Sequence, residues 1–514
     1  MKQSEAPGYS MLKSARWTVV LSIALATADN FAEPDLWIHM LTGLTILRTG
    51  HIPRFDTYSY AAANMPWHNH EWLSQVVLAF CFAHLGVFGL KLWKLLVSTV
   101  LIGALAIGLS ASGAAARIQR LTLILTAVAI STQMQFRPQL FTFMMAAVVM
   151  ASLAIEIYRG SAPLWILIPL FTLWANFHGG YIVGLGALGV AAGVAFLQGF
   201  ADAARMRSAW RIGLVGLACA AATLINPFGI GLWTGVAHSV GDPLIRQIVN
   251  DWVPLTKLML HMWRDDPRQL LQDLAPSFLF FAFVASVALT RDLDDAPLVA
   301  VALIFIGAGI YAARNVAPAV IALAIPLARH ASLALEGGHA RGQQEISAEP
   351  APALLGVCAV MLALVGGTFS NRLATWKPVP MGALAYMQQH ALHGNMLCQF
   401  EWGSYILWHM GDSFKVYIDP RGELVYTDKM EGDYARFFYG MDGAQSLLDA
   451  SPHDYVLMGA QTRGADLVRK DPRWHLLYSD QTAVLFGHVP SPGEAPVIGN
   501  VAGRDGKPSD TYYP

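Results

Sequence analysis

The sequence predicts an α-helical polytopic membrane protein with a soluble α/β domain at its C-terminal end. Of 514 residues, 55% are hydrophobic and 13% are charged, and the mean hydropathy is +0.43. A soluble domain usually carries about a quarter charged residues, so this composition indicates an integral membrane protein. Long apolar runs recur as far as Thr368, and the composition becomes that of a soluble protein from Ser370 onward.

Apolar runs of roughly 14 to 22 residues are long enough to cross the hydrocarbon core of a bilayer. We expect about eleven spans of this kind, and they are Trp17–Ala32, Gly89–Ser112, Leu121–Met134, Leu140–Tyr158, Pro163–Ala175, Tyr181–Phe200, Ile212–Ile225, Pro276–Thr290, Pro297–Ala312, Val316–Ala331 and Pro352–Thr368. The stretch Glu71–Val87 is either a further span or an amphipathic helix on the membrane surface.

The orientation follows from the positive-inside rule, by which basic residues gather in cytoplasmic loops. If Glu71–Val87 lies on the surface, the basic loop residues on the N-terminal side are Arg117, Arg120, Arg159, Arg205, Arg207, Arg211 and Arg291. The N-terminus is then cytoplasmic, and the polar motifs gather on the opposite face of the membrane. Three short spans end at these motifs, which predicts a recessed, water-filled cavity there.

The expected domain boundaries follow from these features. Residues 1–369 form the transmembrane domain, with a first external loop at 33–88 and a second at 229–275 that is long enough to act as a lid. Residues 370–490 form a periplasmic α/β domain with strand-like runs at Lys415–Asp419, Tyr455–Met458 and Ala483–Phe486. The tail 491–514 is rich in Gly, Pro and Asp and is expected to be disordered.

Charge and cysteine content exclude other classes. A net charge of −1 provides no dominant basic surface for a nucleic acid. The four cysteines are scattered without metal-binding spacing. Neither a disulfide framework nor a zinc site is therefore predicted.

The first external loop opens with the acidic motif Glu33-Pro34-Asp35 and continues through Trp37-Ile38-His39 and Trp67-His68-Asn69-His70-Glu71-Trp72. Acidic and imidazole side chains are costly near lipid, so a cluster of them at the membrane edge predicts a functional site. The alternative is that Glu33 and Asp35 merely open a helix expected at Leu36–Thr49.

A multi-helix membrane protein with an acidic motif in its first external loop resembles the GT-C superfamily of glycosyltransferases, which take sugars from polyprenyl-phosphate carriers. The resemblance is closer still to a group of bacterial membrane proteins placed with these enzymes, through Glu33–His39, Gly43, Gly50, Pro53, Asp56, Ser59, Trp67–Ser74, Arg137-Pro138-Gln139, Trp174–Gly180 and Asp419-Pro420-Arg421. It implies transfer of a hexosyl or pentosyl group to a lipid, glycan or protein acceptor on the periplasmic face, with membrane lipids around the enzyme.

The resemblance implies that Asp35, together with Glu33, is catalytic, because a carboxylate in a partly desolvated cavity can deprotonate an acceptor hydroxyl. Arg137 and Arg314 each lie where an apolar helix meets the outer side. A guanidinium group binds phosphate oxygens in a bidentate manner, so these two arginines are candidates for holding the carrier phosphate. Their alternative role is that of interface anchors that reach lipid headgroups.

The other candidate substrate-binding residues are His39, Asp56, His70, Glu71, Asn176 and His178. No cofactor is required in this scheme. A divalent metal held by His68 and His70 with a first-loop carboxylate is an alternative to a hydrogen-bonded network, since GT-C enzymes divide between metal-dependent and metal-independent members. Lys91 and Lys94 begin a span and are interpreted as lipid anchors.

In the α/β domain, Asp419-Pro420-Arg421 is interpreted as an ion pair that shapes a turn, with ligand binding as the alternative. Glu401-Trp402-Gly403 and, in the second loop, Asn250–Pro254 are further candidate contacts. The rival functions are a transporter or flippase for lipid-linked glycans and a non-catalytic envelope assembly protein. A transporter should carry polar groups near the bilayer midplane and related halves, whereas here they lie toward one face and no repeat is present.

Overall fold

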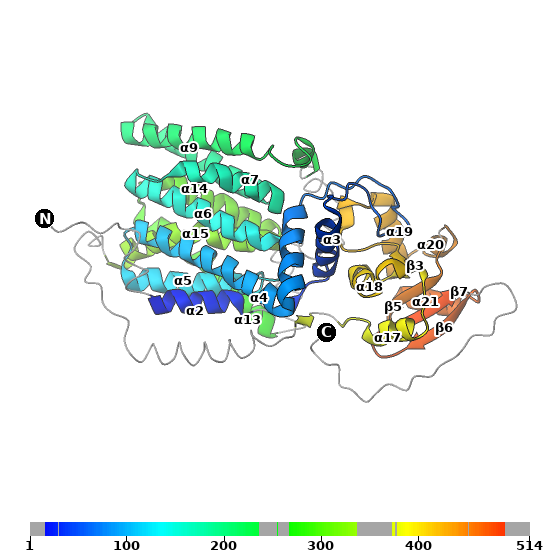
Figure 1. Ribbon diagram of the computed structural model, residues 1–514. Coiled ribbons are helices and arrows are strands. Elements are labelled where there is room, and N and C mark those ends of the chain that lie inside the picture. The colour runs from blue at the N-terminus through cyan, green and yellow to red at the C-terminus, as the bar shows by residue number, and fades with distance from the viewer. Residues whose placement is uncertain are drawn as a thin grey trace. The chain divides into compact units, whose positions relative to one another are not determined.

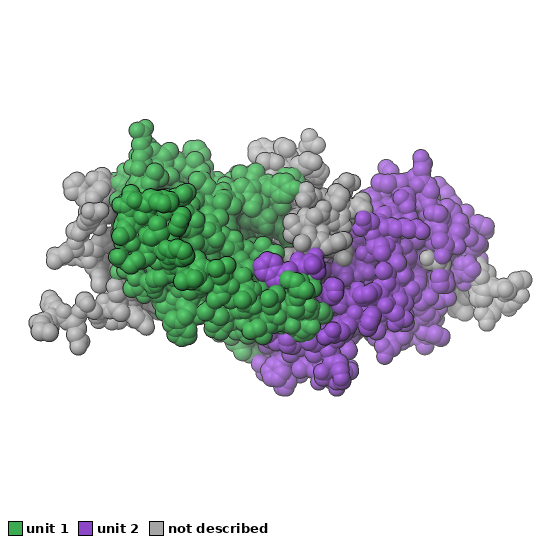
Figure 2. All heavy atoms as spheres, turned by 90° about the horizontal axis from the view of Figure 1, so that it is seen from above, with its two compact units in different colours: residues 1–30, 88–232, 249–371 green, residues 31–87, 233–248, 372–514 purple. Residues whose placement is uncertain are grey.

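The computed structural model describes residues 16–28, 30–235, 254, 267–336, 373–375, 378–450 and 452–488. The chain divides into two compact units, coloured in Figure 2. Unit 1 comprises residues 1–30, 88–232 and 249–371, and unit 2 comprises residues 31–87, 233–248 and 372–514. The expected span Pro352–Thr368, the tail 491–514, most of the expected lid and the Asn250–Val253 segment lie outside the described residues.

Unit 1 is built from α-helices that lie side by side (Figure 1). They are α2 (Arg16–Thr27), the second part of α4 (Trp72–Ala111), α5 (Ala116–Ser131), α6 (Gln139–Arg159), α7 (Leu167–Phe177), α8 (Tyr181–Gly199), α9 (Ala203–Ala222), α13 (Pro267–Thr290), α14 (Ala296–Tyr311) and α15 (Val316–Glu336). A helix therefore lies at each described position where a span was expected.

Four described helices are long and apolar enough to cross a membrane: α4, α6, α8 and the Ala313–Leu335 stretch that contains α15. Four shorter ones are also apolar: Trp17–Thr27, Leu164–Phe177, Leu274–Thr290 and Ala296–Tyr311. The expected membrane-protein architecture, a set of apolar helices with a C-terminal sheet region, is confirmed at this level. The count of eleven spans stays a prediction.

Helix α6 lies inside unit 1, where it contacts α7, α8, α14 and α15. Close packing is achieved where one partner lacks a side chain. At Gly108 of α4, an added Cβ would lie 2.4 Å from the Cδ1 atom of Ile325 in α15. Any larger residue there would push the two helices apart, because protein interiors contain few voids that could absorb the extra volume.

The start of α9 differs from the expected span Ile212–Ile225, since the helix begins at Ala203. Two arginines in the first half of α9 interact with polar groups of other segments of the protein. Arg205 donates to the carbonyl of Ile157, and Arg211 forms a 2.9 Å ion pair with the buried Glu156 at the C-terminal end of α6. Hydropathy marks only the apolar part of a helix, so it placed the boundary too late.

Unit 2 contains a five-stranded mixed sheet with the order β4 (Phe414–Val416), β3 (Gly394–Cys398), β5 (Tyr455–Gly459), β7 (Ala483–His488), β6 (Trp474–Ser479). The first three strands are parallel, and β7 is antiparallel to both of its neighbours. The helices of this domain are α17 (Met381–Gln389), α18 (Gly403–Met410), α19 (Asp428–Tyr439), α20 (Gln445–Ala450) and α21 (Arg463–Lys470). The C-terminal module therefore has the small α/β fold that the sequence predicted.

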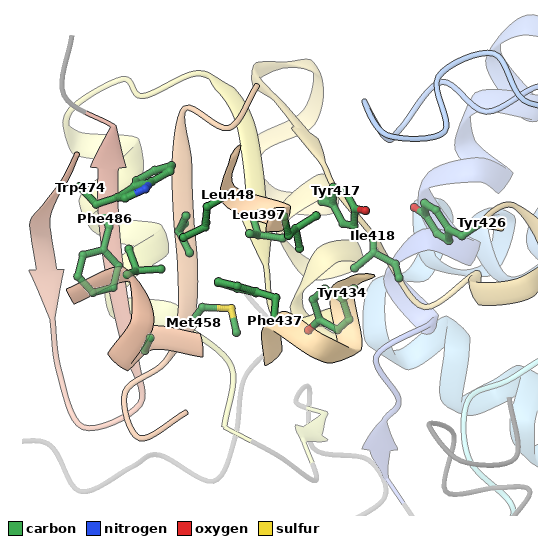
Figure 3. Close-up of a cluster of buried hydrophobic side chains, with 14 of the residues drawn as sticks. Leu397, Tyr417, Ile418, Tyr426, Tyr434, Phe437, Leu448, Met458, Trp474 and Phe486 are labelled. Carbon is green, nitrogen blue, oxygen red and sulfur yellow. The ribbon is translucent and has the colours of Figure 1, made fainter. Parts of the chain in front are cut away.

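The core of this domain lies between the sheet and its helices (Figure 3). Leu397, Val456 and Phe486 come from three neighbouring strands, and Phe437 comes from α19. All four are at most 1% exposed. Burial of each such side chain contributes on the order of 1.5 to 3 kcal/mol, which is the main stabilisation of the domain.

The Phe31–Val87 segment belongs to the same compact unit as this α/β domain. It contains β1 (Phe31–Ala32), α3 (Leu36–Thr49) and the first part of α4. Strand β1 pairs in parallel with β2 (Ala374–Thr375). The backbone around Ser59 pairs with Val416 of β4, and Ala62 and Trp67 lie in the domain core. The chain between α3 and α4 is therefore a built-in part of the α/β fold.

A buried guanidinium group joins these two parts of unit 2. Arg421 donates to Asp419 at 2.6 and 2.8 Å, and its Nη1 atom lies 2.6 Å from Asp56. Its guanidinium carbon lies 4.8 Å above the Trp67 ring and 5.1 Å above the Tyr58 ring. The interpretation of Asp419 and Arg421 as an ion pair that shapes a turn is confirmed.

Asp56, a candidate substrate-binding residue, is the second anion of this network and is 1% exposed. Its other carboxylate oxygen accepts hydrogen bonds from the hydroxyl and the backbone N–H of Ser59. The structure thus places Asp56 inside the domain core, where its oxygens are occupied by protein groups.

Replacement of Arg421 by Met should destabilise unit 2 by roughly 3 to 5 kcal/mol, because two buried carboxylates lose their counter-charge. Thermal unfolding in detergent, followed by intrinsic fluorescence, measures the effect. The matched control is Arg436→Met, which removes an exposed ion pair with Asp433 and should leave the melting temperature nearly unchanged. Equal melting temperatures for wild type and the Arg421 variant would contradict a central role of this network.

Acid should also destabilise unit 2 through His409, which packs against Trp37 and Tyr405. Burial lowers the pKa of His409 from 6.5 to about 4. The unfolded chain therefore binds more protons between these values. The contribution of the neutral His409 to the free energy of unfolding is fully present above pH 6.5 and decreases as the pH falls toward 4. At pH 5 the decrease is on the order of 1 to 2 kcal/mol.

Melting temperatures between pH 7 and pH 5 test this expectation. The His409→Phe variant keeps an aromatic ring without a titrating nitrogen, so its melting temperature should depend less on pH. The exposed His393 provides the control, because His393→Asn should keep the slope of the wild-type protein. A variant slope as steep as that of the wild type would remove His409 as a source of the acid sensitivity.

Candidate active site

The acidic motif lies directly before α3, and Asp35 is the residue that precedes the helix. Asp35 has right-handed helical dihedral angles (φ −77°, ψ −14°), and its carboxylate makes no capping hydrogen bond to α3. Its side chain is 15% exposed. Helix α3 thus begins where the alternative interpretation expected it to begin, and Asp35 adds negative charge at its N-terminal end without a side-chain cap, so both interpretations of the motif stay open.

His39 lies one turn further along α3, between two carboxylates. Its Nε2 atom is 3.8 Å from Asp35 Oδ2 and 3.8 Å from Glu71 Oε2. The other oxygen of Glu71 is 3.8 Å from Nε2 of His70. The structure thus brings together four sequence-predicted site residues of unit 2, and all four side chains are largely buried. At 3.8 Å the imidazole is beyond hydrogen-bond distance of either carboxylate, so proton transfer between these groups requires a closer approach or one bridging water molecule.

The side-chain amides of Asn69 and Gln75 form a hydrogen-bonded pair next to His39. Asn69 and Gln75 exchange two hydrogen bonds of 2.7 and 2.9 Å, and both residues are 2% exposed. The Nε2 atom of Gln75 also lies 3.5 Å from Nδ1 of His39. Helices α3 and α4 approach closely here because Gly43 has no side chain. An added Cβ at this position would lie 2.0 Å from the carbonyl oxygen of Gln75. Glycine at this position sets the spacing that brings His39 to Glu71.

The metal interpretation of the first loop is not supported by the arrangement of its ligands. His68 is exposed while His70 is partly buried. Within the described ranges, no three or more His, Cys, Asp and Glu side chains are grouped so that they could hold a metal ion. We therefore assign no step to a metal.

In unit 1, Arg137 and Arg314 lie on turns that are hydrogen-bonded to each other. Gln133 donates to the carbonyl of Ala313 at 2.9 Å, and its side-chain oxygen accepts from the N–H of Ala317 at 3.1 Å. Gln139 donates to the carbonyl of Arg314 at 3.5 Å. The two sequence-predicted arginines are thus carried by adjoining backbone segments at the N-terminal end of α6.

His178 is fixed at the same end of α6. Its Nδ1 atom accepts hydrogen bonds from the backbone N–H of Gly180 at 2.9 Å and from Thr142 at 2.8 Å, and the indole of Trp174 donates to that Thr142 hydroxyl. A backbone N–H can only donate, so Nδ1 carries no proton and Nε2 carries it. Gly180 is required here, since an added Cβ would lie 2.2 Å from the Thr142 hydroxyl.

Asn176 has a different environment from the other candidates. It is 8% exposed, and its amide nitrogen donates to the carbonyls of Thr172 and Ile225, each at 2.8 Å. Asn176 therefore joins the end of α7 to the segment that follows α9. Orientation of the neighbouring Phe177 and His178 depends on this attachment.

The interpretation of Lys91 and Lys94 as lipid anchors was wrong. Lys91 is 2% exposed and Lys94 is fully buried, with its Nζ atom 5.0 Å from the centre of the Phe136 ring. Phe136 directly precedes Arg137. Lys94 therefore lies inside unit 1 beside the segment that carries Arg137. The signal in the sequence was the position of the two lysines within an apolar run, where a charged group is costly unless it has a function.

The candidates thus fall into two groups, one in each unit. Unit 2 contains Glu33, Asp35, His39, Asp56, His70 and Glu71, and unit 1 contains Arg137, Asn176, His178 and Arg314. Within unit 2, Asp35, His39, Glu71 and His70 form one chain of contacts, and Glu33 is half-buried next to it. Asp56 is engaged separately, with Arg421.

Comparison with known proteins gives a structural relationship. No protein-family model matches the sequence, and no curated protein matches it significantly. Among solved structures, the oligosaccharyltransferase of Archaeoglobus fulgidus in its apo form is similar with a TM-score of 0.59 and 12% identity, over 88% of this chain and 70% of that chain. The structure of the same organism's oligosaccharyltransferase AglB with an inhibitory peptide and a dolichol-phosphate gives a TM-score of 0.55 at 12% identity, over 95% and 75%.

A third structure, the A. fulgidus oligosaccharyltransferase tethered to an acceptor peptide, gives a TM-score of 0.54 at 11% identity, over 94% of this chain and 74% of that chain. Identities this low establish a common fold and nothing about activity. The similarity extends over both the helices of unit 1 and the α/β domain of unit 2, because it covers nearly the whole chain. The fold of this protein is accordingly similar to that of these oligosaccharyltransferase structures.

Proposed function

We propose that this protein is an integral membrane glycosyltransferase of GT-C type that moves a hexosyl or pentosyl group from a polyprenyl-phosphate carrier to a lipid, glycan or protein acceptor. The observation that carries the proposal is the Asp35–His39–Glu71 cluster at the position of the GT-C acidic motif, in a chain that has the GT-C fold. The presence of a dolichol-phosphate and an inhibitory peptide in one similar structure supports a lipid-phosphate donor and an external acceptor.

In this proposal Asp35 is the general base. Its carboxylate accepts the proton of the acceptor hydroxyl while the hydroxyl oxygen bonds to the anomeric carbon of the sugar. The bond between that carbon and the carrier phosphate breaks, and its electron pair leaves with the phosphate. His39, 3.8 Å from Asp35, is placed to pass the proton onward, and Glu71 on its other side stabilises the imidazolium that forms.

The departing phosphate gains negative charge and needs fixed positive charge. Arg137 and Arg314 supply it in this proposal, and the buried Lys94 adds to it beside Phe136. The N-terminal end of α6 lies in the same region of unit 1, and the positive end of its helix dipole favours an anion there. His178 presents a proton on Nε2 and serves as a hydrogen-bond donor to phosphate or sugar oxygens.

Glu33 and His70 complete the donor and acceptor contacts around Asp35 in this scheme. Asp56 and Asn176 are assigned structural roles instead, because Arg421 and backbone carbonyls occupy their polar atoms. Asp56 orders the loop between α3 and α4, and Asn176 holds the end of α7.

The decisive experiment compares sugar transfer from a polyprenyl-phosphate donor by purified wild-type protein and by two variants. Asp35→Asn should lower kcat by roughly 10²- to 10⁴-fold, the usual contribution of a general base. Arg314→Gln should mainly raise the KM for the donor, because it removes a phosphate ligand. Asp412→Asn changes an exposed carboxylate of the same unit and should keep wild-type kinetics.

Unchanged turnover in Asp35→Asn would remove Asp35 from the mechanism. A wild-type protein that transfers no sugar from any polyprenyl-phosphate donor would favour a transporter of lipid-linked glycans or a non-catalytic assembly protein over the enzyme.

We further propose that the protein lies in the bacterial inner membrane with a cytoplasmic N-terminus and a periplasmic C-terminal domain. Fusions of a reporter enzyme after Gly113 and Ala201, in the turns before α5 and α9, should report cytoplasmic locations, and a fusion after Ser370 should report a periplasmic one. The physical reason is the basic residues that follow these turns, which the positive-inside rule retains in the cytoplasm. The reverse pattern of signals would invert the topology.

A further inference from the structure

The acidic motif is a three-residue segment between two elements that are attached to the C-terminal module. Directly before it, β1 pairs in parallel with β2, in the register Phe31 to Ala374 and Ala32 to Thr375. Directly after it, α3 packs against α18. Both partners, β2 and α18, belong to the chain beyond residue 372. The position of Glu33-Pro34-Asp35 is therefore set from both sides by a region more than 330 residues away in the sequence.

One side chain of α18 contacts the motif itself. The hydroxyl of Ser404 donates a hydrogen bond to the carbonyl oxygen of Pro34, and Ser404 is fully buried. This carbonyl belongs to the peptide group that joins Pro34 to Asp35. A hydrogen bond to it fixes the plane of that peptide group, and with it the direction in which the Asp35 side chain leaves the backbone.

The start of α18 cannot move easily relative to the sheet. An added Cβ on Gly403 would lie 2.5 Å from the carbonyl oxygen of Ile418, two residues after β4. The neighbouring Tyr405 is 2% exposed and packs edge to face on Trp37 at 5.5 Å between ring centres. Ser404 is thus held between the sheet of the α/β domain and the first turn of α3.

We infer that the α/β domain positions the acidic motif and that Ser404 is the residue through which it does so. The inference rests on the proposed role of Asp35. Ser404 touches the backbone of the motif and no reacting group, so it is a positioning residue. Its loss lets the Pro34–Asp35 peptide group rotate, which displaces the carboxylate from the acceptor hydroxyl without changing the contacts of the carrier phosphate.

The test is the Ser404→Ala variant, which removes the hydroxyl and leaves no new bulk. In the transfer assay, kcat should fall at least tenfold while the KM for the donor stays within about twofold, because small displacements of a reacting group affect the chemical step. Ser404→Cys retains a weak donor of similar size and should recover part of kcat. Ser446→Ala removes an exposed serine-to-carbonyl hydrogen bond in the same domain and should behave as wild type.

Hydrogen exchange gives a readout that does not depend on activity. The N–H groups of Leu36 and His39 donate to the carbonyls of Glu33 and Asp35, at 3.0 and 3.1 Å. Exchange at these two amides should become faster in Ser404→Ala and remain at the wild-type rate in Ser446→Ala. Amides of the sheet, such as those of β5, should exchange as in the wild type, which shows that the domain is folded.

Wild-type kcat and wild-type exchange at Leu36 and His39 in Ser404→Ala would overturn the inference, as would a change in donor KM with kcat unaffected. A wild-type protein without transfer activity would overturn the proposed function alone. The exchange rates would then decide whether Ser404 holds the motif.

Discussion

The buried guanidinium of Arg421 is the interaction on which unit 2 depends. It neutralises Asp419 at the end of a strand and Asp56 in the segment between α3 and α4, and the rings of Tyr58 and Trp67 cover it. Burial of a charge is tolerated only when partners surround it, so these groups must come together for either part to fold. The polar segment after the acidic motif is thereby a structural element of the α/β domain.

The same constraint shapes the candidate site. Asp35, His39 and Glu71 are largely buried in unit 2, and Lys94 and Lys91 are buried in unit 1. Groups of this kind reduce stability unless their neighbours are fixed in advance. Several contacts fix the neighbours of the candidate site residues. They are the tight contacts at Gly43, Gly180 and Gly403, the hydrogen bonds between Asn69 and Gln75, and the hydrogen bond from Ser404. In the proposed function, preorganised charge of this type stabilises the leaving phosphate, which gains negative charge as the bond breaks.

Much of the fold and some of the site could be predicted from local sequence. Apolar runs indicated the helices, short continuous apolar runs indicated strands such as β5 and β7, and the spacing of Asp419 and Arg421 indicated an ion pair that a turn can close. The acidic motif and its position after the first span indicated the GT-C fold. The boundary of α9 and the burial of Lys94 were missed, because hydropathy treats every charged residue as a mark of the membrane surface and ignores partners supplied by other helices. The position of Lys94 within an apolar run was the signal in the sequence for its burial.

The sequence alone determined the helical membrane architecture, the α/β module and the residues that carry titratable chemistry, since these depend on composition and on patterns within one turn or strand. Only the tertiary structure decided that His39 lies between Asp35 and Glu71, that Asp56 belongs to Arg421, and that Ser404 binds the backbone of the acidic motif. Asp35 and His39 are neighbours one helical turn apart, but the other pairs join residues that are distant along the chain, and no local preference specifies such a contact. Packing around the sheet and at Gly43 and Gly403 brings them together.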